Sequence, residues 1–179
     1  PMVITSVSIY GASMILLYTM SCLYHAFTNM RVKKVFQIFD HVSIYLLIAG
    51  TYTPYCLVNL GGAFGGTMFG IIWGLAALGI TIYSVFGNKM RKISSITYIL
   101  MGWLVLVAFI PLKNALPKFS FSMLIWGGLI YTVGFAFYSA KNVKWAHSIF
   151  HLFVIAGSIL HFFSVFFANK YYNSHLENH

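Results

Sequence analysis

Acidic residues and charged residues in general are scarce in this sequence, and their scarcity excludes most soluble protein classes. Only 7% of the 179 residues are charged, and just two are acidic, Asp40 and Glu177. A soluble domain carries about 25% charged residues, so this chain could not cover a globule with so few. With 60% hydrophobic residues, the composition instead predicts an all-α, polytopic transmembrane helix bundle.

Cysteine is also rare, which leaves little room for a disulfide framework. The two cysteines, Cys22 and Cys56, are predicted near opposite ends of neighbouring helices. At 1.5 Å of rise per residue they would lie roughly 20 Å apart, too far to form a disulfide. We therefore expect both to be packing residues.

Long apolar runs predict six membrane-spanning helices, because about 20 apolar residues cross the hydrocarbon. The predicted spans are residues 2–27, 39–59, 66–87, 94–112, 120–140 and 145–169. The helix bundle is thus expected over residues 1–169, followed by a polar tail at 170–179. Part of this tail resembles residues left by cloning, so His175 and His179 are not considered as site residues. Since the chain starts at Pro1 and not at Met, residues upstream are expected.

The basic residues predict the orientation in the membrane. A net charge of +9 would indicate nucleic acid in a soluble protein, but here the basic residues lie in short gaps between apolar runs. We therefore expect no nucleic-acid partner. Three loops on one side carry eight basic residues and the other side carries three; the eight are Arg31, Lys33, Lys34, Lys89, Arg91, Lys92, Lys141 and Lys144. The positive-inside tendency places these loops in the cytoplasm and the C-terminus outside.

Four polar side chains are predicted at one membrane depth, near the cytoplasmic side. His25 ends the first helix, Asp40 opens the second, and His147 and His151 begin the sixth. The spacing of His147 and His151 puts both imidazoles on one helical face, as in helices that offer two ligands to zinc. With His25 as a third ligand, the set matches the three-residue pattern of catalytic zinc, which leaves one position for water.

Other polar residues could assist the metal ion or take part in helix packing. Ser21, one turn before His25, could orient it or the water, and Asp40 could hold that water or bind the metal directly. His41 points about 100° away from Asp40, and His161 lies about 15 Å beyond His151, so neither is expected to be a ligand. Small and polar residues on the first, second and sixth helices are explained equally by helix packing and by a semi-polar cavity rising from the metal.

Three motifs together resemble the hemolysin III proteins of the progestin and adipoQ receptor family. They are the S-x3-H ending at His25, Asp40 with the G-x3-P segment ending at Pro54, and the H-x3-H of His147 and His151. The resemblance implies zinc held by His25, His147 and His151, with Asp40 reaching it through water and Ser21 as the site serine. The family has seven helices and this chain shows six, with the first one absent.

Function remains open between three classes. The leading hypothesis is a zinc-dependent membrane hydrolase, similar to ceramidases, acting on a lipid amide or ester in an intramembrane cavity, or a sensor of membrane state built on that site. In that hypothesis Asp40 accepts the proton of the attacking water, and Ser21 either hydrogen-bonds the developing oxyanion or orients the ligand shell. The alternatives are a pore-forming or cytolytic protein with structural zinc, and a receptor without chemistry. The resemblance also implies a multi-pass protein of a bacterial plasma membrane, involved in membrane-lipid homeostasis, with membrane lipids as partners.

Overall fold

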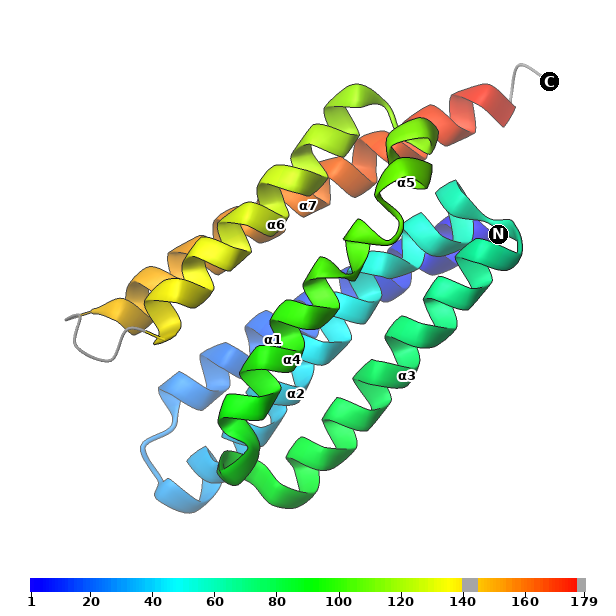
Figure 1. The fold of residues 1–179 in the computed structure, drawn as a ribbon. Helices are drawn as coiled ribbons and strands as arrows, with labels where there is room; N and C mark the ends of the chain where they lie inside the picture. Colours follow the sequence, from blue (N-terminus) through cyan, green and yellow to red (C-terminus); the bar gives the residue numbers. More distant parts are fainter. Residues whose placement is uncertain (140–144, 177–179) are drawn as a thin grey trace. The chain divides into compact units, whose positions relative to one another are not determined.

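The computed structural model describes residues 1–139 and 145–176, and helices dominate throughout this part of the chain (Figure 1). The chain forms two compact units, which are Pro1–Leu104 and Val105–His179. The elements of the first are α1 (Met2–Ala26), α2 (Met30–Pro54), η1 (Tyr55–Leu60), α3 (Gly62–Phe86), η2 (Gly87–Met90), α4 (Arg91–Trp103) and the start of η3 (Leu104–Leu106). Those that follow are α5 (Phe109–Ala115), α6 (Lys118–Ser139) and α7 (Ala146–Leu176).

The central helix of the N-terminal unit is α2, which packs against α1, α3 and α4. Tyr45 of α2 is fully buried, and its ring meets the ring of Tyr98 on α4 edge to face at 4.5 Å. Against α3, Tyr45 lies over Gly79, where even a methyl group would collide with the ring. A small residue at the contact therefore lets two apolar helices approach closely.

The second helix begins at Met30, earlier than the predicted residue 39, so that expectation was wrong. Asn29 caps the helix, because its side-chain oxygen accepts hydrogen bonds from the backbone N–H groups of Arg31 and Val32 at 3.0 and 3.4 Å. The loop after α1 is consequently short, and the basic residues assigned to it lie in the first turns of α2. Lysine and arginine are good helix formers, which explains why the helix extends through them.

A turn at Gly87 connects α3 to α4. Gly87 has a φ of +55°, a conformation open to glycine at little cost. The hydrogen bond from Asn88 to Gln37 ties this turn to the first turns of α2, so both connections lie at the same end of the N-terminal unit (Figure 1). The basic residues of the two connections therefore gather at that end.

The fourth predicted span, 94–112, is not one continuous helix. After Trp103 the chain continues as the short helix η3, turns at Val107 and Ala108, and resumes as α5. Pro111 explains the break: its ring would clash with the carbonyl of Val107 if the helix continued. In α5 the proline stands in the first turn, where no backbone N–H is needed.

The second helix also changes its form at a proline. Because Pro54 has no N–H, the α-helical hydrogen bonding of α2 ends there and the wider π-helix η1 follows. The N–H of Gly61 accordingly donates to the carbonyl of Cys56, five residues back, at 3.1 Å.

Cys56 is buried, Cys22 is exposed, and both are free thiols, which confirms that they form no disulfide.

The C-terminal unit is built on a hairpin of α6 and α7. Ser120 and Ser164 each donate a hydrogen bond to the other's backbone carbonyl, at 2.6 and 2.7 Å. His161 of α7 packs against Gly127 of α6, where an added methyl group would overlap the imidazole. The last helix runs to Leu176, seven residues past the predicted end at 169.

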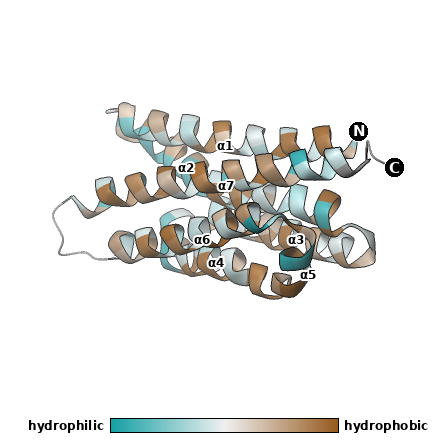
Figure 2. Ribbon diagram, turned by 90° about the horizontal axis from the view of Figure 1, so that it is seen from above, coloured by the Kyte–Doolittle hydropathy of each residue, from teal (hydrophilic) through white to brown (hydrophobic). Residues whose placement is uncertain are grey.

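Five helical stretches among the described residues are long and apolar enough to cross a membrane. They are Met2–Ala26, Met30–Leu60, Gly62–Leu106, Lys118–Ser139 and Ala146–Ser174. Figure 2 shows hydrophobic residues along the helices of each unit, and large apolar side chains such as Ile4 and Val85 are exposed. This confirms an all-α polytopic membrane bundle. Lys141, Lys144, Glu177 and His179 lie outside the described residues.

Candidate metal centre

Two imidazoles stand one turn apart at the start of α7. The Nε2 atoms of His147 and His151 are 3.0 Å apart, and the rings are perpendicular with centroids 4.6 Å apart. Two zinc–nitrogen bonds of about 2.0–2.1 Å in tetrahedral geometry place the nitrogen atoms roughly 3.3 Å apart. This pair therefore has close to the spacing of two ligands of one metal ion.

Aromatic rings on α6 and α7 lie beside the histidine pair. The ring of Phe150 lies 6.2 Å from that of His147 and 5.6 Å from that of His151. Tyr138 of α6 lies 6.3 Å from His147 and 5.0 Å from Phe150. These rings lie on one side of the pair, while His147 remains exposed and His151 is half-buried, so a ligand can still reach the imidazole nitrogens.

A second polar group lies in the N-terminal unit, where α1 meets α2. The Ser21 hydroxyl donates a hydrogen bond to the Asp40 carboxylate, and His25 interacts electrostatically with the same carboxylate. The Tyr24 ring meets the His25 ring edge to face at 4.7 Å. The structure thus brings Ser21, His25 and Asp40 together, with the serine directed at the acid.

As a set of donors, His25, His147 and His151 could hold a metal ion. Each imidazole offers one nitrogen, and neutral imidazole is a ligand that zinc, copper, iron and nickel all accept. Three protein ligands leave a tetrahedral ion one open position. The donor types therefore fit a metal centre, and the residues alone do not specify which metal.

His41 and His161, which were not expected to be ligands, make contacts elsewhere in the structure. The Nδ1 atom of His41 donates to the carbonyl of Gln37 at 2.9 Å, and its ring stacks on Tyr83. His161 is buried in the α6–α7 hairpin against Gly127, with its ring edge to face with that of Tyr131 at 5.2 Å. Neither imidazole belongs to the metal-binding group.

Two polar residues that the structure places near Asp40, Gln37 and Asn88, were not identified from the sequence. Gln37, one turn before His41, hydrogen-bonds to Tyr24 of α1 and to Asn88 of η2. The available signal was the spacing of Gln37, Asp40 and His41, which places three polar side chains within little more than one turn of an apolar chain. Asn88, distant in sequence, gave no such signal.

Comparison with known sequences decides the family. The profile of the family described as "Haemolysin-III related" matches residues 2–162. The chain belongs to the haemolysin III family. This confirms the resemblance seen in the motifs, and together with the apolar helices it shows a membrane-embedded protein.

Individual relatives of this haemolysin III protein come from bacteria and animals. Hemolysin-3 of Bacillus cereus is 45% identical over 92% of this chain and 75% of its own length. The Hemolysin-3 homolog of Bacillus subtilis is 43% identical over 92% of this chain and 77% of its own length. Human monocyte to macrophage differentiation factor is 27% identical over 88% of this chain and 67% of its own, which supports the wider progestin and adipoQ receptor family. No solved structure matches the chain.

Proposed function

We propose that this haemolysin III protein is a zinc-dependent hydrolase of long-chain lipid amides or esters. Zinc would be held by His25 of the N-terminal unit together with His147 and His151 of the C-terminal unit. The observation that carries the proposal is the pairing of a metal-binding donor set with a carboxylate, Asp40, that interacts with one of its members. A structural zinc site needs no such acid, because a fourth protein ligand closes it.

The residues around Asp40 define how hydrolysis would proceed. His25, His147 and His151 would hold the zinc ion, which when bound would supply Lewis-acid chemistry: polarisation of a substrate carbonyl and a lower pKa of water, about 7. Asp40 would accept the proton of the attacking water as the water oxygen forms its bond to the carbonyl carbon. As the bond from that carbon to the amide nitrogen or ester oxygen breaks, Asp40 would return the proton to the leaving group, which departs as an amine or an alcohol.

Ser21 supports this role by holding the base. Its hydroxyl donates to the Asp40 carboxylate, which fixes the carboxylate on the side of α2 that faces α1. A carboxylate held by a neutral donor keeps a lone pair free for a proton. Ser21 is therefore proposed as the residue that orients the base, in place of the alternative role as an oxyanion donor.

The location of these residues favours a lipid substrate. His25, Asp40 and His151 lie on helices that are apolar enough to cross a membrane, and the connections between helices are short. A substrate with long acyl chains can reach such a site from the bilayer. The basic residues at the α1–α2 and α3–α4 connections support a cytoplasmic location of this end in a bacterial plasma membrane, and a role in membrane-lipid homeostasis follows from lipid turnover there.

A pore is the second candidate, because two relatives carry the name hemolysin. In that case zinc would be structural and the protein would permeabilise membranes. Among the described residues Asp40 is the one acidic side chain, so these helices offer few charged groups to line a wide aqueous path. A sensor that binds lipid without cleaving it would keep the same metal centre.

One experiment separates these functions. Purified protein in nanodiscs is incubated with a panel of long-chain N-acyl amides and esters, with and without a zinc chelator, and products are followed by mass spectrometry. The same preparation is added to dye-loaded liposomes. The proposal expects chelator-sensitive release of fatty acid and intact liposomes. Dye release without any hydrolysis would instead support the pore. If neither hydrolysis nor dye release is seen, the lipid sensor is the function that remains.

A further inference from the structure

A closed ring of contacts among four residues lies beside Asp40 in the N-terminal unit. We call it the Gln37 ring; its members are Gln37, His41, Tyr83 and Asn88. The Nδ1 of His41 donates to the backbone carbonyl of Gln37 at 2.9 Å. The His41 ring stacks on the Tyr83 ring, with centroids 4.9 Å apart and an interplanar angle of 6°. The Tyr83 hydroxyl donates to Asn88 at 3.4 Å, and the Asn88 amide donates back to the Gln37 side chain at 3.0 Å.

The ring joins three segments that are distant in sequence. Gln37 and His41 lie on α2, Tyr83 lies in the last turn of α3, and Asn88 lies in the turn before α4. Tyr98 of α4 adds a fourth attachment, since its hydroxyl donates to the backbone carbonyl of His41 at 2.9 Å. Tyr83 is fully buried, so the stacked pair is held from behind by the helix bundle. One turn of α2 is thereby fixed by side chains from α3, the α3–α4 turn and α4.

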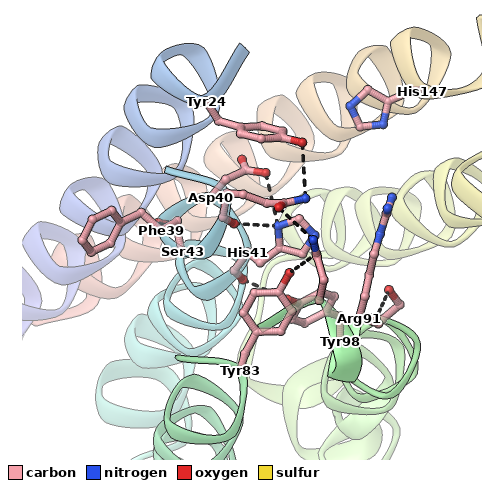
Figure 3. Close-up of polar contacts among 12 residues, drawn as sticks. Tyr24, Phe39, Asp40, His41, Ser43, Tyr83, Arg91, Tyr98 and His147 are labelled. Carbon is pink, nitrogen blue, oxygen red and sulfur yellow. Dashed lines mark hydrogen bonds and ion pairs between the residues drawn. The ribbon is translucent and has the colours of Figure 1, made fainter. Parts of the chain in front are cut away.

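That fixed turn carries Asp40. The Nδ1 of His41 lies 3.6 Å from a carboxylate oxygen of Asp40, the residue before it. Since Nδ1 already donates to the Gln37 carbonyl, the imidazole cannot swing toward the carboxylate without losing that bond. Figure 3 shows Asp40 and His41 on this turn, with Tyr83 and Tyr98 beside them. The ring therefore limits how far the backbone of Asp40 can move.

The ring also reaches the helix that carries the other site residues of this unit. The Gln37 amide donates to the Tyr24 hydroxyl on α1 at 3.4 Å. Tyr24 adjoins His25 in sequence and contacts its ring, and the Lys33 ammonium lies over the Tyr24 ring, 5.4 Å from its centroid. A single side chain, Gln37, thus connects the turn with the base to the turn with Ser21 and His25.

We propose that Gln37 is a positioning residue for the reaction, holding Asp40 and His25 at a fixed separation through its two side-chain hydrogen bonds. This inference rests on the proposed hydrolase function. Packing alone would leave α1 and α2 free to slide by a fraction of an ångström, whereas a catalytic base needs its geometry held within about 0.5 Å. Both arms of the Gln37 amide are used, one toward Tyr24 and one toward Asn88.

The test substitutes Gln37→Met, which keeps the length of the side chain and removes both hydrogen bonds. We expect kcat to fall about tenfold, with KM changed less than twofold, because the base is displaced while the lipid-binding surface is unchanged. Tyr24→Phe and Asn88→Ala each remove one arm and should lower kcat about three- to fivefold. Tyr24→Phe added to Gln37→Met should have no further effect, since the bond between these two side chains is already lost. Asn88→Ala also removes the acceptor of the Tyr83 hydroxyl, so this double variant is not part of the comparison.

Tyr52→Phe is the matched control. The Tyr52 hydroxyl also joins α2 to another helix, donating to the carbonyls of Met101 and Gly102 at 3.0 and 2.9 Å, but it lies about four turns from Gln37. Tyr52→Phe should lower thermal stability as much as Tyr24→Phe and leave kcat unchanged. If Gln37→Met folds poorly, Tyr24→Phe and Asn88→Ala supply the same comparison.

The outcomes distinguish the inference from the function it rests on. Wild-type kcat in Gln37→Met, or in both single-arm variants, would overturn the positioning role while the hydrolase stands. An equal loss of kcat in Tyr52→Phe would reduce the effect to general destabilisation and overturn it as well. Absence of zinc-dependent hydrolysis in the wild type would refute the proposed function, and the positioning role with it.

Discussion

The Nε2 atoms of His147 and His151 face each other at 3.0 Å across one turn of α7. Two neutral imidazoles can share one proton at this distance, with one nitrogen donating and the other accepting. A metal ion instead accepts a lone pair from each nitrogen, so the same geometry serves ligation when neither Nε2 atom carries a proton. Loss of either imidazole then affects the metal far more than loss of a neighbouring histidine.

His151→Ala should lose most of the bound zinc. Removing one of three protein ligands leaves an incomplete set, and the metal content of purified protein, measured by mass spectrometry, should fall from about one zinc per chain to a small fraction. His161→Ala is the control, because His161 lies about 15 Å further along the same helix. Equal zinc content in the two variants would remove His151 from the ligand set.

Zinc should stabilise the wild-type fold and not that of His151→Ala. A ligand that binds only the folded state adds about 2.7 kcal/mol when its free concentration is 100 times its Kd. In detergent, a chelator should therefore lower the melting temperature of the wild type by several degrees and leave His151→Ala unchanged. Insensitivity of both proteins to the chelator would contradict a metal ion bound by His151.

Asp40→Asn should separate metal binding from chemistry. Asparagine keeps the size of the side chain and can still accept a hydrogen bond from Ser21, but it cannot take a proton as a carboxylate does. Zinc content should stay near the wild-type level while hydrolysis of a long-chain lipid amide falls by about two orders of magnitude or more. Parallel loss of zinc and activity would instead make Asp40 a direct ligand.

The loop after α1 should face the cytoplasm. In a background without Cys22 and Cys56, single cysteines are introduced as Asn29→Cys in this loop and as Asn173→Cys near the end of α7. An impermeant thiol reagent added to intact cells should label Asn173→Cys and spare Asn29→Cys, because the basic residues flanking the loop hold it inside. The opposite labelling pattern reverses the orientation.

Gly127→Ala should destabilise the α6–α7 hairpin. The added methyl group meets the His161 imidazole, and forcing an extra carbon into a packed contact costs about 1–3 kcal/mol. Gly128→Ala is the neighbouring control, since nothing lies within 4 Å of its added carbon. The melting temperature of Gly127→Ala should be well below that of Gly128→Ala. Adding His161→Ala to Gly127→Ala should recover part of the lost stability. Equal stability of the two glycine variants rules out this close contact.

Local pattern accounts for the parts of this protein that depend on short stretches of sequence. Apolar runs longer than a bilayer crossing predicted the helices, because an exposed backbone polar group is too costly in lipid. The spacing of His147 and His151 predicted their shared face, because a helix repeats every 3.6 residues. The helix ends were less predictable, since capping by Asn29 and the clash of Pro111 with Val107 compete with hydrophobicity there.

Contacts between distant residues were decided only by the tertiary structure. The bond between Gln37 and Asn88 joins residues 51 positions apart, and the Ser21 hydroxyl reaches Asp40 across two helices. No periodicity encodes such pairs, because they depend on how one helix is rotated and shifted against the next. The sequence by itself determined the membrane class and the chemical types of the candidate ligands. Which polar side chains hold Asp40 in place was set by the packing of α1, α2 and α3, where a rotation of one residue turns a side chain by 100°.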